Sequence, residues 1–257
     1  MTQWDRYKRT IAEESDRFRA LLAPLDSSNR VPSCPEWSAT DLLWHLAEVQ
    51  HFWGEIVARR LDDPDAVSPL DRPDDHGDCL ALFDASSEAL RASLDAAPTT
   101  DTVWTWSHDQ SVGFVVRRQA HEAAVHRVDA ELAGGHPVTP LAPWLGADGV
   151  AELLIDFLGV PPWGAFTRTG GVHVNATDTG DQWTVQLGSV SGTSPASGKS
   201  YDDLRTGLVT EGDFSATVSG TAGNLDLWLW GRSNNVRVTG DAGVAAELRA
   251  IVEETTQ

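Results

Sequence analysis

The spacing of the apolar residues changes at Pro137, and this change limits the fold more than any other feature of the sequence. Before it, apolar side chains recur every three or four residues, the period of an amphipathic helix. After it, most segments alternate apolar and polar residues, the period of a half-buried strand. We therefore predict an α+β chain with two domains: an N-terminal antiparallel four-helix bundle over residues 1–140 and a small α+β domain over residues 141–257.

The helices of the first half have recognisable ends. Ser38 with Asp41 three residues later forms a capping-box pattern, which predicts the start of the second helix. Pro98 ends the third helix, and Gly134 follows the fourth. The four helices are expected over residues 2–25, 38–61, 79–97 and 112–132.

The second half mixes strands with shorter helices. Strands are expected over residues 171–178, 182–188, 214–220 and 235–241. Helices are expected over residues 147–159, 224–231 and 241–254. Asp241 is the predicted N-cap of the last helix. The polar stretch over residues 189–207, SVSGTSPASGKSYDDLRTG, is interpreted as a long insertion or loop.

Composition limits the partners. A formal net charge of −19 opposes binding to nucleic-acid phosphates and anionic lipid surfaces. The sequence has no apolar run long enough for a spanning helix and no apolar core of a signal peptide. Cys34 and Cys79 form neither a disulfide framework nor a thiolate metal motif. We therefore expect a cytoplasmic protein, monomeric or a small homo-oligomer, whose partners are small molecules.

Three residues of the bundle are candidate metal ligands. Glu122 and His126 are four residues apart on the fourth helix, so they project from one face. His45 lies on the apolar stripe of the second helix, which can face the fourth. Two alternatives stay open: His45 as a core histidine with a satisfied hydrogen bond, and Glu122 with His126 as a solvated pair.

Two imidazoles and a carboxylate suit Zn²⁺, and also Fe²⁺ or Ni²⁺. Three protein ligands leave a coordination position open, which is typical of a catalytic site. Asp129, about one turn beyond His126, is placed to orient that ring. The segment HEAAVH is not the HExxH motif of metalloproteases, because its histidines are five residues apart.

Three segments carry a resemblance to a known family: VPSCPEWSATDLLWHLAEV, RRQAHEAAVHRVDAE, and GTAGNLDLWLWGR followed by VRVTGD. Together they resemble the mycothiol-dependent maleylpyruvate isomerase family of actinobacteria, in the same order and over nearly the whole chain. The resemblance implies a DinB-like bundle and a C-terminal domain similar to sterol-carrier folds. It places zinc ligands on His45, Glu122 and His126, and a catalytic, cofactor-binding arginine on Arg232.

The implied function is that of a metal- and mycothiol-dependent isomerase or S-transferase acting on a small electrophile. In the family chemistry the metal lowers the pKa of the thiol, the thiolate adds to a double bond, and rotation and elimination complete a cis–trans isomerisation. Arg232 would bind carboxylate or polar oxygens; the alternative is a structural salt bridge or helix-end contact. Two other functions stay open: a small-ligand or lipid-binding protein with a vestigial metal site, and a metal-dependent hydrolase.

Overall fold

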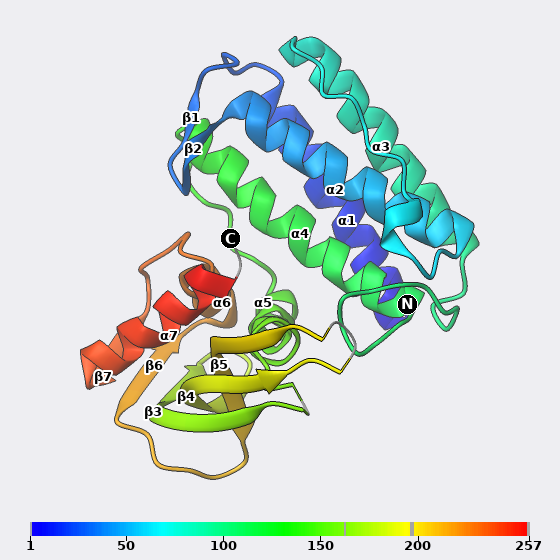
Figure 1. The fold of residues 1–257 in the computed structure, drawn as a ribbon. Helices are drawn as coiled ribbons and strands as arrows, with labels where there is room; N and C mark the ends of the chain where they lie inside the picture. The colour runs from blue at the N-terminus through cyan, green and yellow to red at the C-terminus, as the bar shows by residue number, and fades with distance from the viewer. Residues whose placement is uncertain (1, 162, 196–197, 256–257) are drawn as a thin grey trace. The chain divides into compact units, whose positions relative to one another are not determined.

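A computed structural model describes residues 2–161, 163–195 and 198–255. The chain divides into two compact units, Met1–Thr139 and Pro140–Gln257, and each is described here by itself. The first is helical and the second contains a five-stranded sheet, so the predicted α+β class is confirmed (Figure 1). Among the described residues, no helix has the length and apolar character needed to cross a membrane.

The four main helices of the first unit match the predicted segments. They are α1 (Gln3–Leu22), α2 (Ala39–Arg59), α3 (His76–Ala96) and α4 (Val112–Ala133). The predicted cap of α2 is confirmed: the Ser38 hydroxyl accepts from the Asp41 amide, and the Asp41 carboxylate accepts from the Ser38 amide at 2.8 Å. Between α1 and α2 the chain forms a short hairpin of β1 (Arg30–Val31) and β2 (Cys34–Ser38), which places these residues beside α4.

The directions of the helices differ from a simple up-and-down bundle. Each of α1 and α2 packs against both α3 and α4 (Figure 1). Arg17, near the C-terminal end of α1, pairs with Glu131 in the last turn of α4, so these helices run parallel. The first turns of α2 and α3 meet where Thr40 bonds His76, so these also run parallel. Residues 60–75, which include the 3₁₀ turn η1 (Pro64–Ala66), form the crossover that this arrangement requires.

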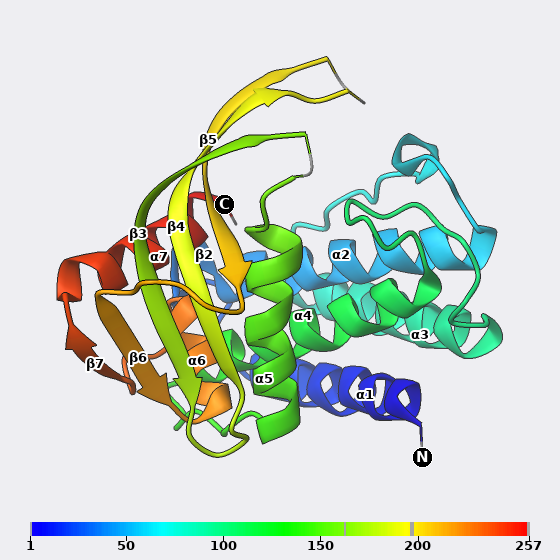
Figure 2. The ribbon, with the colours of Figure 1, turned by 90° about the horizontal axis from the view of Figure 1, so that it is seen from below.

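The second unit is a sheet with helices packed against it. It contains α5 (Pro143–Glu152) continued by the π-helical turn η2 (Leu153–Phe157), β3 (Ala165–Ala176), β4 (Gln182–Thr193), β5 (Ser200–Val209), β6 (Ala216–Gly220), α6 (Ala222–Leu229), β7 (Arg237–Gly240) and α7 (Ala242–Thr255). The strand order is β5-β4-β3-β6-β7, and Figure 2 shows β3, β4 and β5 side by side. Only the β3–β6 pair is parallel among the strands of this sheet that the structure describes.

One core holds this unit together. Alternate residues of the central strands, including Val172, Val174 and Val185, pack in a single buried cluster with side chains of the helices, including Leu225 and Leu248. Strand alternation therefore predicts which side chains face the core. Asp241 accepts hydrogen bonds from the first amides of α7, as predicted for its N-cap.

The interpretation of residues 189–207 as an insertion or loop is wrong. β4 continues to Thr193, and β5 pairs with it in antiparallel register from Val209 opposite Thr184 to Ser200 opposite Thr193. Residues 196–197 lie outside the described part of the chain. The segment SYDDLRTGLV lacks clean alternation because β5 is an edge strand. Backbone hydrogen bonds to β4 hold β5 in the sheet and do not require alternating side chains. Edge strands also tolerate charged residues.

Candidate metal centre

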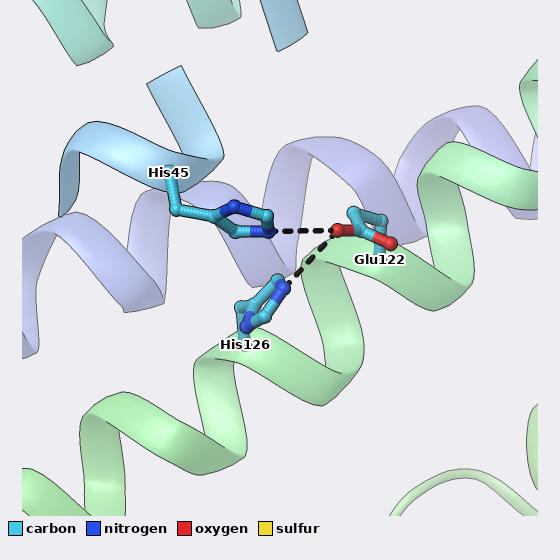
Figure 3. Close-up of side chains that lie close together, drawn as sticks. All are labelled: His45, Glu122 and His126. Atoms are coloured by element: carbon cyan, nitrogen blue, oxygen red, sulfur yellow. Dashed lines mark hydrogen bonds and ion pairs between the residues drawn. The ribbon is translucent and has the colours of Figure 1, made fainter. Parts of the chain in front are cut away.

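His45, Glu122 and His126 converge in the first unit, as Figure 3 shows. Nε2 of His45 lies 3.4 Å and Nε2 of His126 lies 3.1 Å from Oε1 of Glu122. One ligand atom from each of the three side chains lies within 4.8 Å of the others. The imidazole rings meet edge-to-face, with centroids 4.8 Å apart. One ion placed among these atoms can be reached by all three donors.

The exposure of these side chains decides between the alternatives left open by the sequence. His45 is 31% exposed, so it is not a core histidine. Glu122 and His126 are 18% and 9% exposed, so they are not a solvated surface pair. A catalytic metal needs protein donors that are partly buried but still open to solvent, because a substrate or water must also be able to bind the ion.

Two helices and the β1–β2 hairpin position the three side chains. Glu122 and His126 share a face of α4 because they are one turn apart, and His45 reaches them from α2, which packs against α4. The Trp37 ring lies 4.7 Å from the His45 ring and 6.2 Å from the His126 ring, centroid to centroid. The hairpin therefore covers one side of both imidazoles with an aromatic ring.

A hydrogen-bond chain fixes the orientation of His126. Its Nδ1 lies 2.9 Å from Oδ2 of the fully buried Asp129, and the Ser33 hydroxyl donates to the other oxygen of Asp129 at 2.5 Å. Nδ1 is thereby occupied and Nε2 faces Glu122. Burial favours the neutral ring, but hydrogen bonds to Asp129 and Glu122, with their negative charges, raise the pKa of His126 to about 9.

Glu122 is held as a carboxylate. Burial alone would raise its pKa, but hydrogen bonds with His126 and His45, and the charges of His126 and Arg118, hold the pKa well below its ordinary value. Its second oxygen, Oε2, accepts a hydrogen bond from Nη2 of Arg118 at 3.0 Å. An ionised carboxylate oxygen facing two imidazole nitrogens is the donor set that zinc and similar divalent ions bind, so the residues fit such an ion.

Two other histidines of the first unit, His121 and His51, have partners outside this cluster. His121 is buried with its ring 6.3 Å from that of Tyr7, and His51 bonds the Ser68 carbonyl at 3.0 Å. Arg232 lies in the second unit just after α6, where its Nη1 donates to the Trp230 carbonyl at 2.6 Å. That contact is of the kind the helix-end alternative expects.

Sequence reasoning missed three residues that shape the cluster: Arg118, Ser33 and Trp37. Arg118 had a usable signal, because it is four residues before Glu122 on the same helix. Ser33 and Trp37 had only their place in the segment VPSCPEWSATDLLWHLAEV, and it is the folded hairpin that brings them to Asp129 and His126.

The fold and the cluster together define a class: a helical unit with a His-Glu-His donor set, followed by an α+β unit. The family description "Mycothiol maleylpyruvate isomerase N-terminal domain" matches residues 9–131, and "MDMPI C-terminal domain" matches residues 145–247. The chain belongs to the mycothiol maleylpyruvate isomerase family.

Solved structures agree on the fold. The chain is similar to a crystal structure of the mycothiol-dependent maleylpyruvate isomerase, with a TM-score of 0.58, and to that of a histidine-to-alanine mutant, with a TM-score of 0.60. Both are 14% identical, and each match covers 94% of this chain and 95% of the other. No curated protein matches the sequence.

Proposed function

We propose that this protein is an enzyme that uses a divalent metal, zinc in the first place, and a low-molecular-weight thiol, mycothiol, to isomerise or S-conjugate a small electrophilic substrate. Maleylpyruvate is the model for that substrate. The convergence of the three donors from α2 and α4 carries the proposal, and membership of the family names the thiol. The net charge of the protein, −19, also fits small-molecule partners better than nucleic acid or membrane. We further propose a cytoplasmic location.

Each residue of the cluster has a part in this proposal. His45, Glu122 and His126 would hold the ion, and Asp129 would keep Nε2 of His126 turned toward it. A divalent ion held there supplies a Lewis acid that lowers the pKa of a bound thiol. A thiol would approach the ion beside His45, because that side chain is the most exposed of the three.

Arg232 is proposed as a binding residue for substrate or thiol. Its guanidinium lies 5.9 Å from the centroid of the Trp230 ring. An arginine beside an aromatic face offers a planar cation to a carboxylate, as maleylpyruvate-type substrates carry. We expect Arg232→Ala to raise KM for such a substrate and to leave the bound metal in place.

The decisive experiment is elemental analysis of the purified protein beside two variants. We expect about one zinc or similar ion per chain in the wild type and its loss in His126→Ala, because that variant removes one of three donors. His121→Ala is the matched control, since His121 is a buried histidine of the same helix outside the cluster. No metal in the wild type, even after zinc is added, would refute the proposal.

Activity assays then separate the reaction classes. Turnover of an electrophilic double-bond substrate that requires both metal and added thiol supports the proposed enzyme. Metal-dependent turnover of an ester without thiol would assign a hydrolase instead. Co-purified lipid in a metal-free protein would assign a binding protein.

A further inference from the structure

We propose that Arg118 is a positioning residue that restricts Glu122 to one metal-binding oxygen and so keeps a coordination position free for the thiol. This inference rests on the proposed metal-dependent function. It concerns a residue that touches neither metal nor substrate and acts through Glu122.

The geometry divides the two oxygens of Glu122 between different partners. Oε1 faces the imidazoles, 3.1 Å from His126 and 3.4 Å from His45. Oε2 accepts a hydrogen bond from Nη2 of Arg118 at 3.0 Å. Arg118 lies one turn before Glu122 on α4 and is only 4% exposed, so water competes little for this charge-assisted bond.

This division controls how many donors the protein offers. A carboxylate binds a metal through one oxygen or through both, and a zinc site with three protein donors keeps room for a further ligand. If Oε2 also bound the ion, the protein would supply four donors, and a thiol or water could then bind only by raising the coordination number to five. Binding through Oε2 would break the bond from Arg118, whose guanidinium stays charged. The buried charge therefore opposes the bidentate mode.

A simple structural role is the competing interpretation, because i,i+4 pairs are common on helices. The same helix offers a matched case. Arg127 bonds Oε2 of Glu131 at 2.7 Å, also four residues apart and buried, but Glu131 faces Arg17 and the Thr139 amide and not a pair of imidazoles. A role limited to holding α4 together predicts the same behaviour for variants at both arginines.

The test uses the full chain loaded with Co²⁺, whose visible absorption reports coordination number. In Arg118→Met we expect cobalt to remain bound while the intense bands of four-coordination weaken toward those of five-coordination. Binding of β-mercaptoethanol, followed by its thiolate-to-cobalt charge-transfer band, should weaken by about 10–100-fold. Arg118→Lys should restore the wild-type spectrum, since an ammonium group can still donate to Oε2. Arg127→Met should leave the spectrum and thiol affinity unchanged.

The outcomes separate the inference from the function on which it rests. A wild type that binds no cobalt defeats the proposed function itself. A wild type that binds cobalt, with Arg118→Met keeping both the four-coordinate spectrum and the thiol affinity, overturns the role of Arg118 alone. Identical changes in Arg118→Met and Arg127→Met also overturn it. If the methionine variant does not fold, X-ray absorption of the zinc-loaded wild type decides: one Glu122 oxygen at the metal supports the proposal and two refute it.

Discussion

At the scale of single residues, the candidate centre depends as much on what surrounds the three donors as on the donors themselves. Asp129 is fully buried and occupies Nδ1 of His126, while Ser33 occupies the other oxygen of Asp129. An imidazole alone offers either nitrogen to a metal. The buried carboxylate removes that freedom, so it sets the direction in which His126 can donate.

We predict that Asp129→Asn weakens zinc binding by about 10–100-fold, because a neutral amide orients and polarises the ring less than a carboxylate. Titration against a zinc chelator measures the change. In the metal-free protein the pKa of His126 should fall from about 9, since a negative partner is lost, and NMR titration of the ring checks this. Ser33→Ala is the milder control, because it leaves the carboxylate in place. Unchanged zinc affinity in Asp129→Asn would contradict the prediction.

At the scale of elements, α2 carries His45, and its N-terminus is fixed by the capping box of Ser38 and Asp41. Partial burial raises the pKa of Asp41, but hydrogen bonds from the Ser38 hydroxyl and amide, and from Arg72, lower it to about 2. Folding therefore stabilises the ionised form of Asp41 relative to its protonated form. Its contribution to stability is present above the unfolded pKa of about 3.9 and is lost as the pH falls through the folded value.

We therefore predict that Asp41→Asn lowers the free energy of unfolding by about 1–2 kcal/mol at neutral pH, because a neutral amide replaces the carboxylate that accepts from the Ser38 amide and from Arg72. The difference from the wild type should shrink as the pH falls from about 4 to about 2, because Asp41 is protonated first in the unfolded chain and then, as the pH passes through the folded pKa, in the folded chain. Urea unfolding at a series of pH values measures it. A difference that stays constant over this range would show that the charge of Asp41 is not what stabilises the cap.

At the scale of the whole molecule, the two units have separate apolar cores. Leu248 of α7 belongs to the core of the second unit, and Leu46 of α2 belongs to that of the first. Both side chains are fully buried, and Leu46 follows His45 directly in the chain. All three candidate ligands lie in the first unit.

We predict that Leu248→Ala and Leu46→Ala each cost about 2–5 kcal/mol of stability, as buried leucines do. Their effects on the metal should differ. Leu248→Ala should keep the zinc affinity of the wild type, whereas Leu46→Ala should weaken it, because the cavity loosens α2 beside His45. Calorimetry with elemental analysis tests both variants. Equal losses of zinc would indicate that the centre depends on both units.

Local sequence patterns determined the helices of this protein and part of its candidate metal centre. The capping box at Ser38, the glycine after α4 and the period of the apolar residues predicted the helices closely. The spacing of Glu122 and His126 placed them on one face of a helix because helical geometry follows from the chain itself. These features depend on neighbours in sequence, so the sequence alone was sufficient for them.

Only the tertiary structure decided the rest. β5 is a strand because β4 supplies its hydrogen-bond partners, and its own residues carry little sign of it. The parallel pairing of α1 with α4 follows from the crossover over residues 60–75. Trp37 reaches His126, and Ser33 reaches Asp129, from a hairpin far away in sequence. Such contacts join residues that are far apart in the sequence. The local spacing of residues cannot predict them, because it does not say which distant segments the fold brings together.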